Sequence, residues 1–339
     1  EPIEKTGREK RISLVTGIHG DELLGMYVLY EVQRRIHKEP EKLTGILDIY
    51  PAINPLGIDS INRGLPQFDI DMNHIFPGST EGNMTEYMAA KLMDDLIGSD
   101  LCIDVHASDI FLKEIVQVRM QEKDEARLLP FAVQVNADLV WIAASATVKE
   151  ATLAHSLNMF GVPTLAIEAG SGMRIDKTYG DQIVEGILHV MKQEGIWQGE
   201  TNLVRKPDIA HAENVAYANA EASGVFMPVV DIGEYIREGQ HIGEIVNALT
   251  GTVEEVINAP CNGKIITFCI GFSARPCILQ LSSGFCNQIG VDKTVQVSVH
   301  DGADIAHLIA GSVVFDHTVR VENIGAYLTA PADFHLDAL

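Results

Sequence analysis

The sequence has few cysteines, few basic residues and no long hydrophobic run. Its five cysteines among 339 residues are an odd number without a CxxC pair, so neither a disulfide framework nor a zinc ribbon is indicated. No apolar stretch approaches the roughly 18 residues of a membrane helix. The 25 Lys and Arg against 47 Asp and Glu give a formal charge of -22, which repels phosphate backbones. These absences argue against a membrane protein and a nucleic-acid-binding protein.

The same features bear on compartment and partners. Unpaired cysteines indicate a reducing environment, and the first residues, Glu-Pro-Ile-Glu-Lys, show no basic-then-apolar signal segment. We therefore expect a cytoplasmic protein whose partner is a small molecule rather than a nucleic acid or a membrane. The sequence leaves a homo-oligomer open.

Short apolar runs alternate with longer helical patterns from Arg11 to about Glu200. This alternation predicts an α/β domain in which helices cover a sheet. Most polar residues of interest fall where strands end, which is the rim where open α/β sheets bind ligands. The expected strands are Ile12–Thr16, Ile46–Ile53, Leu101–His106, Leu139–Ala143 and Thr164–Glu168, and the expected helices are Glu22–Ile36, Met84–Ile97 and Gly180–Glu194.

The composition changes in the second part of the chain. The stretch from Gly199 to about Ser223 is polar and aperiodic and contains Pro207, so we expect a linker there. From Gly224 to about Phe268, short Val and Ile runs alternate with glycines, which indicates a small β-rich unit without helices. We therefore predict two domains, the α/β domain over residues 1–200, which carries the polar residues of interest, and a β-rich accessory domain over residues 201–339. Further strands are expected near Val295–Val299 and Ser312–Phe315.

A histidine and a glutamate three residues apart follow the first expected strand. They are His19 and Glu22 in the segment Thr16-Gly-Ile-His-Gly-Asp-Glu. One helical or turn-like step places residues at this spacing on the same side, where both can reach one metal ion. Alone, the motif also fits a solvated histidine and a glutamate that caps a helix N-terminus. A metal site therefore needs a third ligand.

The strand Leu101–His106 offers this third ligand, because its last residue is a histidine. A histidine satisfied by a backbone carbonyl is the simpler explanation for His106 alone. Two histidines and one glutamate leave the fourth tetrahedral position for water, which is typical of catalytic zinc. We predict one Zn²⁺ per chain, although the same donors suit iron, cobalt or manganese.

A metal hydrolase also needs a base. The strand Thr164–Glu168 ends on a carboxylate followed by Ala-Gly, and Glu168 is the candidate. It would take a proton from a zinc-activated water and pass it to the leaving nitrogen. A glutamate that faces solvent or pairs with Arg174 is the alternative.

The turn-rich loop between the first two motifs carries Arg63, Asn73 and His74. A guanidinium such as that of Arg63 can polarise a carbonyl or bind a carboxylate. Asn73 and His74 are candidates for orienting substrate. Each of the three also fits a residue that solvates a loop.

These motifs, in this order between about Arg11 and Glu194, resemble the succinylglutamate desuccinylase and aspartoacylase family, which is related to zinc carboxypeptidases. The segment His19-Gly-Asp-Glu resembles the family's HGxE, Asp104-Val-His its strand-end DxH, and Ile167-Glu-Ala-Gly its catalytic glutamate. The resemblance implies a carboxypeptidase-like mixed sheet flanked by helices.

The resemblance also implies roles for individual residues. His19, Glu22 and His106 would bind zinc, Glu168 would be the general base, and Arg63 would stabilise the oxyanion. Asp71 would hydrogen-bond a zinc histidine, Asp104 has the same supporting role, and Asn73 would contact a substrate carboxylate.

This chain departs from the family at His74, where the family usually has arginine. Neutral imidazole binds carboxylates less well than a guanidinium does. The departure leaves open whether the substrate has a free α-carboxylate. Arg174 is the residue that would replace the missing arginine.

The β-rich part resembles the biotinyl- or lipoyl-like fold appended to such deacylases. In carrier domains the hairpin between the two halves presents a lysine, whereas Asn247–Thr252 has none. Covering or shaping the active-site mouth is therefore the expected role of this part.

We predict a deacylase that cleaves the amide bond of an N-acyl amino acid or a related small N-acyl amine. Two alternatives remain open. A zinc carboxypeptidase would use the same metal and base, with Arg174 as carboxylate ligand. A non-catalytic binding protein would use the α/β domain only to hold a ligand.

Overall fold

The computed structural model describes residues 1–2, 7–68, 70–144, 151–269, 272–273 and 278–282. All of them belong to one compact unit, Glu1–Ser298. The strands expected near Val295–Val299 and Ser312–Phe315 lie outside the described residues. No helix within the described ranges is both long and apolar enough to cross a membrane.

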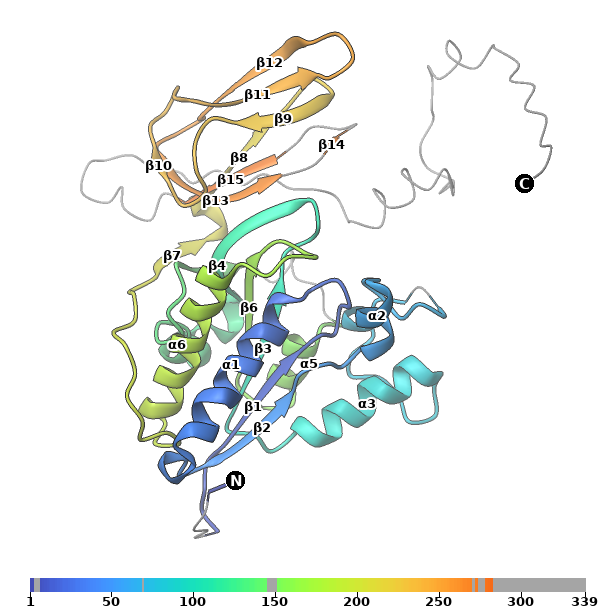
Figure 1. The fold of residues 1–339 in the computed structure, drawn as a ribbon, viewed down its shortest axis with the longest axis vertical. Helices are drawn as coiled ribbons and strands as arrows, with labels where there is room; N and C mark the ends of the chain where they lie inside the picture. The colour runs from blue at the N-terminus through green and yellow to red at the C-terminus, as the bar shows by residue number, and fades with distance from the viewer. Residues whose placement is uncertain (3–6, 69, 145–150, 270–271, 274–277, 283–339) are drawn as a thin grey trace, which may run out of the picture. The chain divides into compact units, whose positions relative to one another are not determined.

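The first two hundred residues form a mixed sheet with helices on both faces (Figure 1). Strands β2, β1, β3 and β6 lie side by side and parallel, β4 is antiparallel to β6, and β5 is parallel to β4. The strands are β1 (Arg11–Thr16), β2 (Ile46–Tyr50), β3 (Leu101–Ala107), β4 (Leu112–Gln121), β5 (Leu139–Ala143) and β6 (Thr164–Gly170). This arrangement confirms the predicted mixed α/β fold.

Two layers of buried apolar side chains cover the two faces of the sheet. Buried side chains of α1 and α6 pack on one face, and those of α3 and α5 pack on the other. The helices are α1 (Leu24–Lys38), α2 (Pro55–Ser60), α3 (Met84–Leu96), α4 (Glu125–Ala132), α5 (Leu153–Met159) and α6 (Lys177–Gln193). All three predicted helices are present. However, α1 begins after Glu22 rather than at it, because the residues from His19 to Leu23 form a turn and irregular backbone.

The second part of the chain is β-rich, as predicted, and has no α-helix between residues 208 and 269. Its strands are β7 (Asp208–His211), β8 (Val215–Asn219), β9 (Gly224–Pro228), β10 (Tyr235–Ile236), β11 (His241–Asn247), β12 (Thr252–Asn258), β13 (Gly263–Cys269), β14 (Phe272–Ser273) and β15 (Ile278–Ser282). Strands β12, β11, β9 and β14 form a separate sheet, whereas β13 pairs with β4 and extends the main sheet.

The linker predicted from Gly199 to about Ser223 is wrong in part, because it contains β7 and β8. These strands have four and five residues, too few to show a clear alternation of apolar and polar side chains. They become strands through their partners, since β7 pairs with β5 and β8 pairs with β15.

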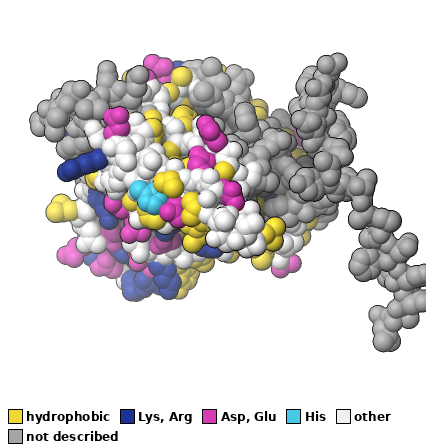
Figure 2. All heavy atoms as spheres, turned by 90° about the horizontal axis from the view of Figure 1, so that it is seen from above, with side chains coloured by type: hydrophobic (Ala, Val, Ile, Leu, Met, Phe, Trp, Pro, Cys, Tyr) yellow, Lys and Arg dark blue, Asp and Glu magenta, His cyan; other side chains and the backbone are white. Residues whose placement is uncertain are grey.

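The described surface carries mixed charge. In the face shown in Figure 2, Asp and Glu side chains lie in several separate groups, while Lys and Arg gather toward one side. This distribution agrees with the excess of acidic residues in the sequence.

The packing of α6 depends on a close approach at Gly186. A Cβ added there would lie 1.9 Å from the carbonyl oxygen of Val135. We expect Gly186→Ala to lower the free energy of unfolding by about 1 to 3 kcal/mol, because the helix must move away from this backbone. Urea unfolding measures the loss. Gln193→Ala, on the exposed end of the same helix, is the control and should change stability by less than about 0.5 kcal/mol. Equal stability of Gly186→Ala and wild type would contradict the packing.

Candidate active site

The turn after β1 presents His19 and Glu22 to the rim of the sheet. Gly17, with a φ of 71°, redirects the chain directly after the strand. The Gly20 amide then donates to the carbonyl oxygens of Asn62 and Arg63, at 3.1 and 3.2 Å. A Cβ at Gly20 would lie 2.0 Å from the carbonyl carbon of Gly57, so glycine is required for this approach. The contact brings the loop with Arg63 against the motif.

His19, Glu22 and His106 come together as a buried cluster. The Nδ1 atom of His19 lies 2.6 Å from Oε1 of Glu22, and Nδ1 of His106 lies 2.9 Å from Oε2. The three residues are 2%, 3% and 4% exposed. One ligand atom from each can be chosen so that all three atoms lie within 4.8 Å of one another. The structure thus places the three predicted metal ligands around one point.

Two further carboxylates orient the imidazole rings from behind. Asp71 Oδ1 lies 2.9 Å from Nε2 of His19, and Asp104 Oδ2 lies 2.9 Å from Nε2 of His106. When each Nε2 carries the proton of its hydrogen bond, both Nδ1 lone pairs face the Glu22 carboxylate. Three electron-pair donors then face one another, an arrangement that a cation stabilises. The donor set therefore fits a divalent metal ion.

The pKa shifts of the metal-free cluster have the same origin. Burial lowers the pKa of His19, but the Glu22 charge and the Asp71 hydrogen bond outweigh it and raise that pKa to about 9. Burial disfavours the Glu22 carboxylate, yet the two histidines hold its pKa well below the usual value. Without a metal, protons on the imidazoles supply the positive charge. A metal ion must therefore displace protons to bind.

Glu168 stands beside the cluster on the next strand. It is the register partner of His106 between the parallel strands β3 and β6, so both side chains project from the same face. Burial raises the pKa of Glu168 to about 7, against the opposing effects of Arg119 and His106. A carboxyl group with this pKa can both accept and release a proton near neutral pH.

Arg63 lies at the edge of the same cluster. Its Nη1 is 3.1 Å from Oε1 of Glu22, and its Nε is 3.2 Å from Oδ2 of Asp71. The side chain is 42% exposed, so part of the guanidinium is open to solvent. The two carboxylates fix the direction of this cation.

The three remaining predicted residues have different surroundings. Asn73 accepts a hydrogen bond from the Leu153 amide at 2.9 Å, which ties the loop to α5. His74 is 44% exposed, with Nε2 at 3.8 Å from Oδ2 of Asp71. Arg174 is exposed and forms no ion pair with Glu168 or with any other residue whose placement is described. The structure thus brings His74 to the cluster but does not bring Arg174 to the predicted base.

Sequence reasoning missed the cation nearest to Glu168. Arg119, on β4, has its Nη1 at 3.9 Å from Oε1 of Glu168 and its guanidinium 5.3 Å from the centre of the Trp141 ring. The available signal was an alternation of apolar and polar residues, Val116 to Gln121, in a segment for which no strand was predicted.

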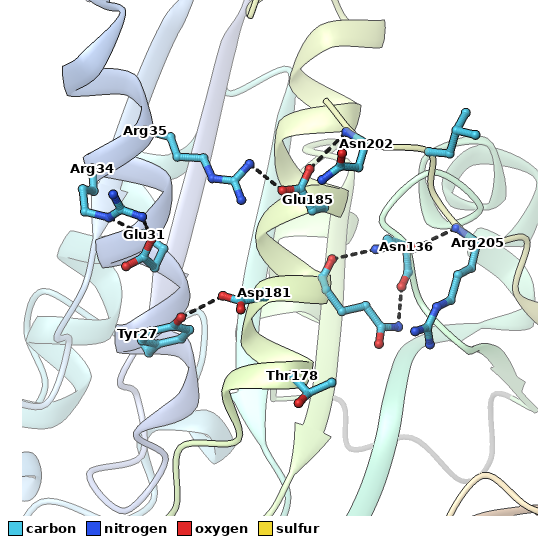
Figure 3. A pocket seen from close by; sticks show the side chains of 12 residues that line it. Tyr27, Glu31, Arg34, Arg35, Asn136, Thr178, Asp181, Glu185, Asn202 and Arg205 are labelled. Atoms are coloured by element: carbon cyan, nitrogen blue, oxygen red, sulfur yellow. Dashed lines mark hydrogen bonds and ion pairs between the residues drawn. The ribbon is translucent and has the colours of Figure 1, made fainter. Parts of the chain in front are cut away.

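A cavity of about 620 Å³ lies elsewhere, between α1, α6 and the segment 202–205 (Figure 3). Its three arginines are paired, two of them within its own wall and Arg205 with Asp138, at 2.7 Å between Nη1 and Oδ1. Arg34 Nε donates to Glu31 at 2.9 Å, and Arg35 lies 2.5 Å from Glu185. These pairs offset the arginine charges that would otherwise attract an anionic ligand.

The raised pKa of Glu168 makes a prediction for the stability of the metal-free protein. The folded state holds a proton on Glu168 more tightly than the unfolded state does, so this contribution to stability is present at low pH and is lost as pH rises from 4.5 to about 7. Glu168→Gln carries no charge at any pH. From pH 5.5 to pH 8, the free energy of unfolding of the variant should therefore rise relative to wild type by about 2 kcal/mol.

Urea unfolding at both pH values measures this difference. Glu41→Gln, which changes an exposed carboxylate, is the control and should show no such trend. A difference between Glu168→Gln and wild type that stays constant with pH would contradict the burial of the charge.

Comparisons with known proteins show to which family the chain is similar. The model of the succinylglutamate desuccinylase/aspartoacylase catalytic domain matches residues 8–193. A curated relative, the N-alpha-acetyl-L-2,4-diaminobutyric acid deacetylase of Halomonas elongata, is 24% identical over 261 residues, which are 75% of each chain.

Solved structures show the same fold. The succinylglutamate desuccinylase/aspartoacylase of Rhodobacter sphaeroides has a TM-score of 0.68 at 23% identity, and the ectoine utilization protein EutE (DoeB) of Ruegeria pomeroyi has a TM-score of 0.70 at 21% identity. Each alignment covers 81% of this chain and 85% of the other. With more than half of its residues matched by the family model, the chain belongs to the succinylglutamate desuccinylase/aspartoacylase family.

Proposed function

We propose that this chain is a zinc-dependent hydrolase that cleaves the amide bond of an N-acyl amino acid or a related small N-acyl amine. The observation that carries the proposal is the buried His19–Glu22–His106 cluster, with Glu168 beside it on the adjacent strand. Family membership supports an amide-hydrolysing deacylase. We assign residues 1–200 to catalysis and residues 201–339, of which the described part is β-rich, to an accessory domain that covers or shapes the mouth of the site.

The residues present fit one zinc ion per chain, held by Nδ1 of His19, a carboxylate oxygen of Glu22 and Nδ1 of His106. When bound there, zinc supplies a Lewis acid that makes water more acidic and polarises a carbonyl group. Asp71 and Asp104 hold the two rings in the tautomer that leaves Nδ1 free of a proton.

Glu168 performs the proton transfers in the proposed reaction. Its carboxylate takes a proton from the attacking water, whose oxygen bonds to the carbonyl carbon of the substrate. The C–N bond then breaks, and Glu168 passes the proton to the leaving nitrogen. The products are a carboxylic acid and an amine. A pKa near neutrality suits a group that must accept and donate in turn.

Arg63 is assigned to the carbonyl oxygen, where negative charge develops. Nε and Nη1 are directed at Asp71 and Glu22, which leaves Nη2 for the substrate. A guanidinium fixed before the reaction stabilises developing charge without the cost of reorientation. Its exposed fraction of 42% supports access by a substrate.

The amino acid part of the substrate is assigned to the loop that carries Asn73 and His74. Oδ1 of Asn73 accepts from the Leu153 amide, so Nδ2 is the group that we assign to a substrate carboxylate. The relative from Halomonas elongata is named for an N-acetylated amino acid, which supports this substrate class. His74, where an arginine is usual in the family, makes a weaker carboxylate contact than a guanidinium.

Replacing the base tests the proposal. Glu168→Gln keeps the size of the side chain and leaves all three metal ligands, but it removes the proton acceptor. We expect unchanged zinc content and a kcat at least about 100-fold below that of wild type. The measurement is hydrolysis of a panel of N-acetyl amino acids, N-acetylated diamines and C-terminal peptides.

The same panel distinguishes the deacylase from a carboxypeptidase, because only the latter releases C-terminal residues from peptides. Glu185→Gln, which changes a glutamate of the separate cavity, is the matched control and should retain wild-type turnover. Wild-type turnover in Glu168→Gln would remove Glu168 from the mechanism. Failure of zinc-loaded wild type to cleave any amide in the panel would overturn the proposed function.

A further inference from the structure

Strand β4 places an arginine between two carboxylates, one of which is the proposed base. Nη2 of Arg119 lies 2.7 Å from Oε1 of Glu114, and Nη1 lies 3.9 Å from Oε1 of Glu168. Glu114 is only 2% exposed. No other cation lies within 4.0 Å of Glu168 among the described side chains. The reaction proposed above gives no task to Arg119 or Glu114.

The contact continues into the β-rich part of the chain. Thr267, on β13, is the register partner of Glu114 on β4, and its hydroxyl donates to Oε1 of Glu114 at 3.2 Å. The same carboxylate oxygen thus accepts from both Thr267 and Arg119. A series of contacts therefore runs from β13 through Glu114 and Arg119 to Glu168.

Electrostatics gives this series a physical role. The carboxylates of buried Glu114 and partly buried Glu168 repel each other, and a guanidinium between them offsets the repulsion. The terminal torsion of a glutamate side chain is soft, so the carboxylate plane takes its direction from its neighbours. Because Arg119 attracts Oε1 of Glu168, the direction of Oε2 is restricted as well. Small errors in the placement of a reacting group reduce turnover strongly.

We propose that Arg119 is a positioning residue for Glu168, and that the β-rich part of the chain takes part in catalysis by fixing Arg119 through Glu114 and Thr267. This inference rests on the proposed role of Glu168 as base. It gives the β-rich part a defined task beyond covering the site. The Arg119 side chain is 38% exposed, so contact with the substrate is the competing explanation that the test must separate.

Steady-state kinetics of the zinc-loaded protein provides the first test. For Arg119→Gln we expect kcat to fall about 100-fold, with KM within about twofold of wild type and unchanged zinc content. Arg119→Lys keeps the charge, so its kcat should be about tenfold above that of Arg119→Gln. A raised KM with unchanged kcat would instead make Arg119 a substrate-binding residue, and loss of zinc would make it a structural one. Either result overturns the proposal.

The role of the β-rich part is tested by Thr267→Val. We expect kcat to fall about threefold, because a single hydrogen bond to Glu114 is lost. Thr252→Val is the matched control, since Thr252 lies in the same β-rich part and donates to the Glu254 carboxylate at 2.7 Å, outside the proposed series. Combined with Arg119→Gln, Thr267→Val should have no further effect. If the fall in kcat of the double variant equals the product of the two single falls, Thr267 does not act through Arg119.

A second test does not depend on activity. In the metal-free protein at pH 8, where Glu168 with its pKa of about 7 is ionised, Arg119→Gln should lower the urea midpoint less in the Glu168→Gln background than in wild type, because the amide of that background has no charge to leave unpaired. Arg119→Lys serves in the same cycle if the Arg119→Gln variant does not fold. Equal losses in both backgrounds would overturn the contact between Arg119 and Glu168. If the Arg119 and Glu168 substitutions are coupled but the protein hydrolyses no amide, the contact stands and only the proposed function is contradicted.

Discussion

The carboxylate of Glu22 is buried between two imidazole rings, and the local structure is arranged around this charge. A buried carboxylate is stable only when cations or hydrogen-bond donors surround it. Glu22 receives both histidine rings, one guanidinium nitrogen of Arg63 and the backbone amide of Ala107, at 2.6 to 3.1 Å. Asp71 and Asp104 then hold the far side of each ring. Carboxylates and imidazole rings thus alternate through the cluster. A metal ion would replace the protons that the rings hold toward Glu22.

The fold brings these groups together from distant parts of the sequence. The turn after β1 supplies His19 and Glu22, the end of β3 supplies His106, and the end of β6 supplies Glu168. The three strands are parallel neighbours, so their carboxyl ends meet at one edge of the sheet. The contact of Gly20 with the backbone of Asn62 and Arg63 adds the loop from the remaining side. On the other side of β6, the antiparallel strand β4 contributes Arg119, and β4 is itself paired with the β-rich part.

Sequence patterns predicted the strands and helices whose apolar residues recur over a long enough stretch, such as α3 and β3. They also predicted the three residues that meet in the buried cluster, because His19 and Glu22 are close in sequence and His106 ends an apolar strand. The pattern was less informative where polar residues interrupt a strand. β4 carries Lys113, Glu114 and Arg119, and the surroundings of these side chains depend on pairing across strands that the sequence does not reveal.

Two other features depended on contacts that form only in the folded chain. The short strands β7 and β8 are strands because of β5 and β15, which lie far away in sequence. Arg174 follows Glu168 closely in sequence, yet the exposed backbone turn after β6 leaves it in solvent, whereas the distant Arg119 faces the carboxylate. Proximity in sequence was therefore a poor guide to the ion pairs of the predicted base.

On the proposed function, the buried cluster binds one divalent cation, which displaces protons from its histidines. Calorimetric titration of Zn²⁺ into the metal-free protein at pH 7, in buffers of different ionisation enthalpy, tests it most directly. We expect one tight site per chain with net release of protons, because the pKa of His19 is raised to about 9 without the metal. It also predicts loss of this site in His106→Ala but not in His37→Ala, which changes an exposed histidine on α1. Absence of saturable binding in wild type, or tight binding that persists in His106→Ala, would contradict the account.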